Sequence, residues 1–188
     1  LQHRVLYIMA KRIKFLFPEC YVDTNIMKTL FLLDGVNHQH SCSKVLGSMR
    51  SLRFKDKFAI GIVDDDKRKT YDYGDFRVLA KSNHLTLMKH NSRMHFLIFV
   101  SKAAEDLLLS CASELNLDMA IFNLPNDLEG LKNITKDCES DKEPRIKRLV
   151  NALRKASEMS RLQRTINYLL EKQYQTDEKE LISLFTQQ

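Results

Sequence analysis

The strongest constraint on the fold is the apolar run Phe58–Val63, which ends abruptly at Asp64. It contains no charged or polar side chain and is bounded by charged residues on both sides. Such a short, unbroken run is typical of a strand that is buried on both faces of a parallel sheet. The run therefore predicts a sheet covered by helices on both sides, as in α/β proteins.

The segments around this strand alternate between strand and helix patterns. In chain order we expect a strand over 12–17 stopped by Pro18, a helix ended by Gly35, a strand over 36–42, a short helix capped by Ser43, the buried strand, a charged turn over 64–75, a hairpin or strand pair over 85–90 and 94–100, and a helix from Ser101 to about Leu115. This alternation predicts a mainly parallel sheet flanked by helices.

After Leu124 the pattern becomes helical throughout. Apolar residues at spacings of three and four predict one long amphipathic helix over 142–172, with one stripe facing the body of the protein, and a short helix follows at about 177–186. We therefore expect an α/β domain over 9–124 and an all-helical extension over 125–188 that packs on it. A chain of 188 residues, 44% of them hydrophobic, is long enough to bury a core without disulfides or a structural metal.

Cysteine usage and hydropathy predict a soluble protein in the reducing cytoplasm. The four cysteines form no C-x-x-C pair, no signal-peptide pattern begins the sequence, and no apolar run is long enough to cross a bilayer. We expect no membrane partner. Met9-Ala10-Lys11-Arg12 is similar to a natural translation start, so residues 1–8 are expected to be foreign to the domain.

The positive charge is concentrated near one end. The segment 142–172 holds nine basic residues and three acidic ones, a net charge of +6. The whole chain also has a net charge of +6, so the rest of the chain is neutral overall. Lys147, Arg154 and Arg161 recur every seven residues and would line up on one helix face. That face is a candidate surface for a polyanion, although a solvated outer face explains the same pattern.

Acidic residues follow two of the expected strands. Glu19 and Asp23 come just after the first strand, and Asp64, Asp65 and Asp66 follow the buried one. Ligands of α/β sheets gather at the carboxyl ends of the strands, so these carboxylates are expected to meet there. Clustered carboxylates repel one another unless a cation lies between them, and Mg²⁺ suits such an open oxygen site. A solvated turn and a helix cap are the alternatives.

Two segments resemble motifs of the Toprim domain, which topoisomerases, primases and several nucleases share. Residues 17–23 have a Glu at the end of a strand and an Asp four residues later, and residues 60–66 end a strand in Asp-x-Asp. Glu105-Asp106 is similar to the acidic helix start of some Toprim-like nucleases. The resemblance covers about residues 11–115. Cys20 stands where the family commonly has Gly, and Lys67 and Arg68 follow Asp-x-Asp where it often has Gly.

This resemblance implies a Toprim-like, Rossmann-like fold and phosphoryl transfer on DNA or RNA. Glu19 would be the general acid or base, while Asp64 and Asp66 would hold Mg²⁺ (or Mn²⁺), supported by Asp23. The basic residues expected to contact nucleic acid are Lys67, Arg68 and Lys69 at the mouth of the site and Lys147, Arg154 and Arg161 on the long helix.

The predicted function is a small Mg²⁺-dependent nuclease or nuclease subunit, acting alone or with a partner protein. The alternative is a non-catalytic module that binds nucleic acid or a partner protein through the basic helix 142–172. The chain is too short to add the DNA-cleaving domain of a topoisomerase or the polymerising body of a primase.

The histidines offer a second, separate metal hypothesis. His38, His40 and Cys42 alternate, so on a strand all three would face one side, as in a zinc or copper site. A fourth ligand is not apparent, and histidines are common in loops. His84, His90 and His95 flank the expected hairpin and receive no role. No nucleotide-binding glycine loop or nucleophile elbow is present in the sequence.

Overall fold

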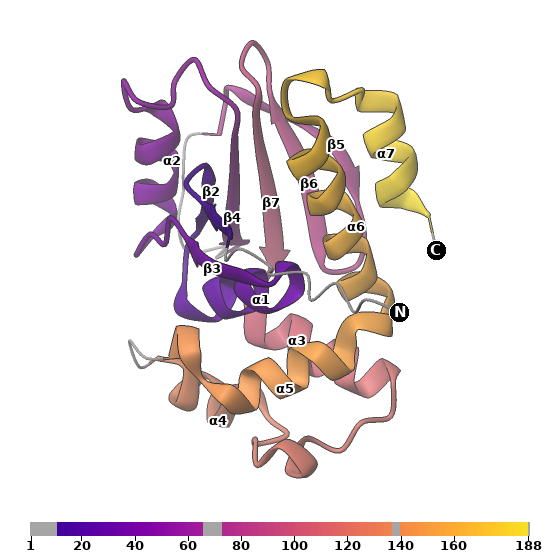
Figure 1. The fold of residues 1–188 in the computed structure, drawn as a ribbon. Coiled ribbons are helices and arrows are strands. Elements are labelled where there is room, and N and C mark those ends of the chain that lie inside the picture. Colours follow the sequence, from indigo (N-terminus) through magenta and orange to yellow (C-terminus); the bar gives the residue numbers. More distant parts are fainter. Residues whose placement is uncertain (1–10, 66–72, 137–139, 188) are drawn as a thin grey trace, which may run out of the picture.

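A computed structural model describes residues 11–65, 73–136 and 140–187, with a five-stranded sheet between two helical layers (Figure 1). The strands are β1 (Lys11–Ile13), β2 (Leu16–Pro18), β3 (Leu33–Val36), β4 (Ala59–Asp65), β5 (Phe76–Lys81), β6 (Leu85–His90) and β7 (His95–Ser101). The α-helices are α1 (Tyr21–Phe31), α2 (Cys42–Arg50), α3 (Ala104–Glu114), α4 (Leu128–Thr135), α5 (Pro144–Ala152), α6 (Ser157–Lys172) and α7 (Glu178–Thr186). Short 3-10 turns lie at η1 (Met119–Phe122), η2 (Ser140–Lys142), η3 (Leu153–Lys155) and η4 (Gln173–Gln175).

The predicted buried strand is β4, which lies inside the sheet. The strand order is β2-β4-β7-β6-β5, in which β2, β4 and β7 are parallel and β6 and β5 run antiparallel to their neighbours. Ile60 and Ile62 are almost completely buried, as the apolar run predicts. The expected α/β class is confirmed, with a mixed sheet: the hairpin of β6 and β7 and the unpredicted edge strand β5 add its antiparallel half.

The first predicted strand is divided in two. A turn at Lys14 and Phe15 separates β1 from β2, and β1 pairs in parallel with β3 in a separate two-stranded sheet. Leu32 ends α1 with a left-handed backbone (φ 51°), so β3 begins at once and Gly35 lies inside it. The helix end predicted at Gly35 and the strand predicted over 36–42 were therefore wrong in their bounds.

The helix caps also differ from the expected ones. Ser41 rather than Ser43 caps α2, and α3 begins after Ala103 because β7 extends through Ser101.

The long helix predicted over 142–172 is interrupted. Ala156 is extended (φ −65°, ψ 143°) and separates η3 from α6. The N-terminus of α6 is capped from another helix, because the Ser157 amide and hydroxyl donate to the carboxylate of Glu114 at 2.8 and 2.9 Å. This cap from the end of α3 explains a break that neither Gly nor Pro marks in the sequence.

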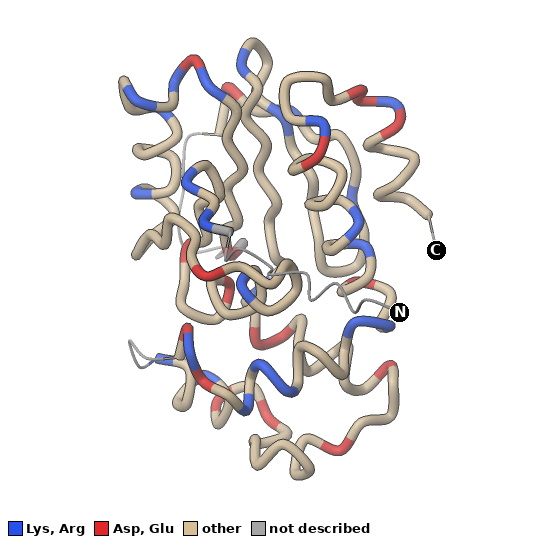
Figure 2. Tube along the Cα trace, viewed as in Figure 1, with Lys and Arg blue, Asp and Glu red and all other residues tan. Residues whose placement is uncertain are grey.

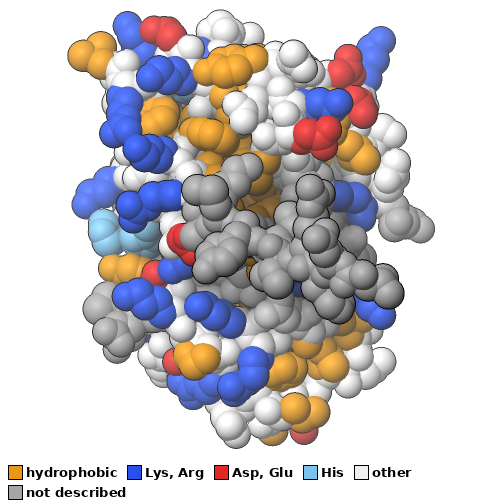
Figure 3. All heavy atoms as spheres, viewed as in Figure 1, with side chains coloured by type: hydrophobic (Ala, Val, Ile, Leu, Met, Phe, Trp, Pro, Cys, Tyr) orange, Lys and Arg blue, Asp and Glu red, His pale blue; other side chains and the backbone are white. Residues whose placement is uncertain are grey.

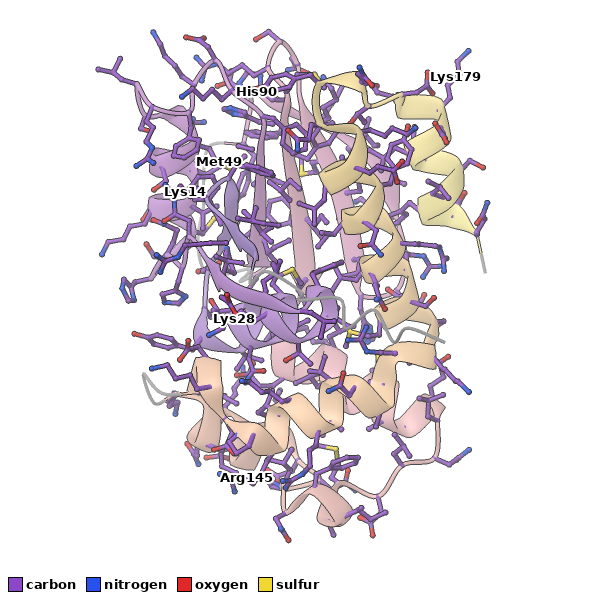
Figure 4. All side chains as sticks on the ribbon, in the orientation of Figure 1. Lys14, Lys28, Met49, His90, Arg145 and Lys179 are labelled. Carbon is purple, nitrogen blue, oxygen red and sulfur yellow. The ribbon has the colours of Figure 1, made fainter. Side chains whose placement is uncertain are left out.

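The core is continuous across the two predicted units. One apolar cluster joins β4 and β7 to α1 and α3 and also includes side chains of α5, α6 and α7. The opposite face of the sheet is covered by α2. There Gly61 has no room for a side chain: an added Cβ would lie 2.6 Å from a Leu97 methyl, 2.8 Å from a Val45 methyl and 3.0 Å from the Met49 sulfur. Met49 is labelled on α2 in Figure 4.

Among the described residues, no helix is long and apolar enough to span a membrane.

Candidate metal centre

The parallel pairing of β2 with β4 brings Glu19 next to Asp64. Leu16 is opposite Ile60 and Pro18 is opposite Ile62, so the residues that follow these strands emerge at the same edge. The Glu19 amide donates to the Ile62 carbonyl at 2.9 Å. In return the Asp64 amide donates to Glu19 Oε2 at 3.0 Å. The two acids are thus held side by side by the sheet's own hydrogen bonding.

Asp23 joins this pair from the first turn of α1. Its carboxylate Oδ2 accepts from the Cys20 thiol at 3.0 Å and from the Cys20 amide at 3.3 Å, and its own amide donates to Cys20 Sγ at 3.3 Å. Cys20 is thus the N-cap of α1 and Asp23 completes its capping box, so Asp23 has the capping role of the alternative but not that role alone. The cap is also part of the acidic edge, because ligand atoms of Cys20, Asp23 and Asp64 all lie within 4.8 Å of one another.

A fourth carboxylate, Glu105, comes from the first turn of α3. It is buried and accepts a hydrogen bond from the Thr135 hydroxyl at 2.5 Å. Its charge helps to raise the pKa of both Asp23 and Asp64. Of the acidic pair at this helix start, only Glu105 faces the cluster, since Asp106 lies 3.7 Å from Lys102 and 4.0 Å from His84.

The electrostatics of the cluster are those of like charges in a dry site. Burial, together with the charges of Asp23, Glu19 and Glu105, raises the pKa of Asp64 to about 9, against a lowering effect of the Ala104 amide. Burial, with Glu19 and Glu105, raises the pKa of Asp23 to about 7, against the lowering effect of the hydrogen bonds from Cys20. Burial and the nearby acids also raise the pKa of the Cys20 thiol, which stays protonated as a donor.

One oxygen in this cluster lacks a partner. Asp64 Oδ1 is buried and has no hydrogen bond from any residue that the structure describes. A buried carboxylate oxygen without a donor is costly, and a cation between the carboxylates would remove both that cost and the mutual repulsion. The hard oxygen donors of Glu19, Asp23 and Asp64 fit Mg²⁺ or Mn²⁺, whereas the protonated thiol of Cys20 is a poor ligand for them.

The structure describes only some of the other acidic and basic residues that were predicted for the site. Asp66, Lys67, Arg68 and Lys69 lie outside the described residues, and so does the side chain of Asp65. Lys147 is half-buried on α5, beside Lys28 of α1. Because the long helix is broken at η3, Lys147, Arg154 and Arg161 belong to three different elements and do not form one straight row.

Two of these cations are bonded within the protein. Arg154 donates to the carbonyls of Thr29 and Leu30 at 2.7 and 3.1 Å, at the end of α1. Arg161 donates to the Phe185 carbonyl at 2.6 Å, at the end of α7, and forms an ion pair with Glu158. Both guanidinium groups cap helix C-termini.

The second metal hypothesis loses one of its ligands. The centroids of the His38 and His40 rings are 4.7 Å apart. Cys42, however, begins α2, and its sulfur forms a hydrogen bond of 3.0 Å with the Tyr73 hydroxyl. His38 stacks on Tyr21, with 4.3 Å between ring centroids, and its Nδ1 lies 2.8 Å from the Thr24 hydroxyl.

The hairpin histidines are bonded to main-chain groups. His95 Nε2 is 3.0 Å from the Phe54 carbonyl, and His90 Nδ1 accepts from the amides of Ser92 and Arg93.

Comparison of the chain with models of known protein families, with curated proteins and with solved structures finds no match.

Proposed function

We propose that this protein is a Mg²⁺- or Mn²⁺-dependent phosphodiesterase acting on nucleic acid, a small Toprim-like nuclease or nuclease subunit. The observation that carries the proposal is the approach of Asp23 and Asp64 within 4.8 Å at the carboxyl edge of β2 and β4, with Glu19 on the Asp64 amide. Asp64 Oδ1 is buried there and has no partner among the described residues. Open α/β sheets bind their ligands at this edge.

Each acidic residue has a distinct task in this proposal. Asp64 and Asp23 hold the divalent cation, and binding requires that both lose the protons that their raised pKa values favour. Glu19 is oriented by the amide of Asp64 and acts as the general acid or base. When bound, the cation neutralises the charge that develops on the transferred phosphoryl group.

The alternative function, a binding module that uses the basic helix, has weaker support. Arg154 and Arg161 donate to main-chain carbonyls, so their positive charge is partly used within the fold. A pure binding module also has no need to bury several like charges, which reduces stability unless they serve a purpose. The carboxylate cluster therefore favours an enzyme.

Calorimetric titration of Mg²⁺ and Mn²⁺ into the wild type, Asp64→Asn and Glu19→Gln tests the proposal. We expect saturable binding to the wild type and a loss of at least tenfold in affinity for Asp64→Asn, together with metal-dependent cleavage of DNA or RNA by the wild type alone. Asp106→Asn is the matched control, because this acid is adjacent to Glu105 but points away from the cluster. Absence of metal binding by the wild type, or equal binding by Asp64→Asn, would refute the proposal.

A further inference from the structure

A groove with basic walls runs between α2 and the β1–β3 pair. Two adjoining hollows share Asn37 and Arg53: one also contacts Lys44 and Gln39, and the other contacts Arg12 and Lys14. We call these six residues the basic groove. Among its described lining residues there is no Asp or Glu. Figures 2 and 3 show Lys and Arg gathered on the side of the molecule that carries α2 and β1.

The four cations of the basic groove are available to an external anion. Arg12, Lys14, Lys44 and Arg53 are all exposed. None of them forms an ion pair with any residue in the described part of the chain, in contrast to Arg50, which lies 3.7 Å from Asp75. No acid in the described part of the chain therefore neutralises their charge, whereas Arg161 is paired with Glu158 and Arg154 donates to carbonyl groups.

The floor of the basic groove is already ordered by hydrogen bonds. Asn37 Nδ2 donates to the Lys14 carbonyl at 3.1 Å, and Gln39 Nε2 donates to the Asn37 side chain and carbonyl at 3.1 Å. Ser48 of α2 donates to Gln39 Oε1 at 2.9 Å, which ties the two walls together. A site that is organised before its ligand arrives loses less entropy on binding.

The basic groove ends beside the candidate metal centre. The amides of Asn37 and Gln39 donate to the carbonyls of Leu16 and Pro18 at 3.0 and 2.9 Å, so this segment lies along β2 like an added strand. Glu19 follows Pro18 directly. The floor therefore leads along β2 to the edge at which the carboxylates converge.

We infer that the basic groove binds the phosphodiester backbone of a nucleic-acid strand and leads it to the carboxylate cluster. Four exposed cations without an ion pair to a described residue, side-chain amides of Asn37 and Gln39 on the floor and no acid among the described lining residues match a chain of phosphates that is bound without sequence preference. The binding step stands on the groove alone; the delivery to a cleaving site rests on the proposed function.

Fluorescence anisotropy with end-labelled 20-nucleotide single-stranded DNA and RNA, in EDTA and at several KCl concentrations, tests the binding step. If all four cations contact phosphates, log Kd rises with log salt at a slope of roughly 3, and each neutralised cation lowers this slope by about 0.7. We expect Lys44→Glu and Arg53→Glu each to weaken binding at least tenfold at low salt, and Lys44→Gln to lower the slope. The DNA and RNA arms show which backbone is preferred.

Lys155→Glu is the matched control, since it makes the same change in net charge at an exposed position of the C-terminal basic segment. It should bind within twofold of the wild type. No binding by the wild type, or equal weakening by Lys155→Glu and Lys44→Glu, would overturn the inference. A cleavage assay on the wild type and Asp64→Asn separates the two proposals: binding that depends on the groove, without metal-dependent cleavage by the wild type, supports the groove and removes the nuclease.

Discussion

Glu158, which is buried, and Asp64, which is half-buried, are two acids with opposite surroundings. Glu158 accepts from the Ser82 hydroxyl at 2.5 Å and the His84 amide at 3.2 Å, and it pairs with Arg161. Asp64 lies among like charges and keeps one oxygen without a partner in the described residues. The first acid joins α6 to the β5–β6 turn, whereas the second reduces stability, which fits the metal site that we propose.

The largest effect is expected at the satisfied acid. Glu158→Ala should lower the free energy of unfolding by about 3–5 kcal/mol, because it leaves the half-buried Arg161 guanidinium and two further donors without their acceptor. Urea denaturation measures this loss. Glu171→Ala, exposed on the same helix, should stay within about 0.5 kcal/mol of the wild type. A loss below about 1 kcal/mol for Glu158→Ala would show that Glu158 does not stabilise the fold, and the contrast with Asp64 would be lost.

Substitution of Asp64 should change the free energy of unfolding in the opposite direction. Asp64→Asn should raise the free energy of unfolding by about 2 kcal/mol at pH 8 in EDTA, since it removes a carboxyl that must take up a proton on folding, because the fold disfavours its charged form. The pKa of Asp64 is raised to about 9 in the folded state, so its stabilising share is complete below about pH 4 and is lost as the pH rises through 9.

Urea denaturation at pH 5 and pH 8 checks this sign. The advantage of Asp64→Asn should grow with pH, and Mg²⁺ should stabilise the wild type but not the variant. Destabilisation by Asp64→Asn at both pH values would contradict the comparison.

Much of the carboxylate cluster could be predicted because it follows from local sequence. An apolar run that ends in Asp64 identifies a buried strand, and the rule for strand ends then places Glu19 and Asp23 nearby. The basic groove could not be predicted in this way, since Arg12, Lys14, Lys44 and Arg53 are brought together only by the pairing of β1 with β3 and the packing of α2.

The helix break and its effect on the basic residues were equally hidden. Nothing near Ala156 in the sequence signals a stop; Glu114, which caps α6, is 43 residues away from Ser157. The regular spacing of Lys147, Arg154 and Arg161 describes charge along the chain but not the carbonyl groups that accept hydrogen bonds from two of them.

Arg154 extends the comparison to a basic residue. Arg154→Met should lower the free energy of unfolding by about 2 kcal/mol, because the last carbonyls of α1 lose two charged donors while most of the apolar stem is kept. Affinity for single-stranded nucleic acid should not change by more than twofold. Thermal unfolding and anisotropy check the two halves, with Lys155→Met as the exposed control. An Arg154→Met variant that is as stable as the wild type but binds nucleic acid weakly would support the alternative function, binding through the basic helix.

The smallest effect concerns a buried base. Burial lowers the pKa of His95, so its neutral form is favoured in the fold, and its stabilising share is present above about pH 6.5 and lost as the pH falls. From pH 7.5 to 5.5 the wild type should lose at most about 1.4 kcal/mol through this group, the limit for an imidazole that stays neutral in the fold. His95→Gln should show a shallower decline in urea titrations at the two pH values. An equal decline would assign the pH dependence to other groups, such as His90, whose pKa is also lowered.

Gly61, in the interior of the protein, determines the position of a helix that lines the outer surface. With no side chain between β4 and α2, the contacts of Val45 and Met49 decide how near the helix stands to the sheet. The same helix carries Lys44 and forms one wall of the basic groove. The width available to a phosphate chain is therefore set at a buried residue. A single methyl group added at Gly61 would move the α2 wall of the groove, although no residue of the groove itself would have changed.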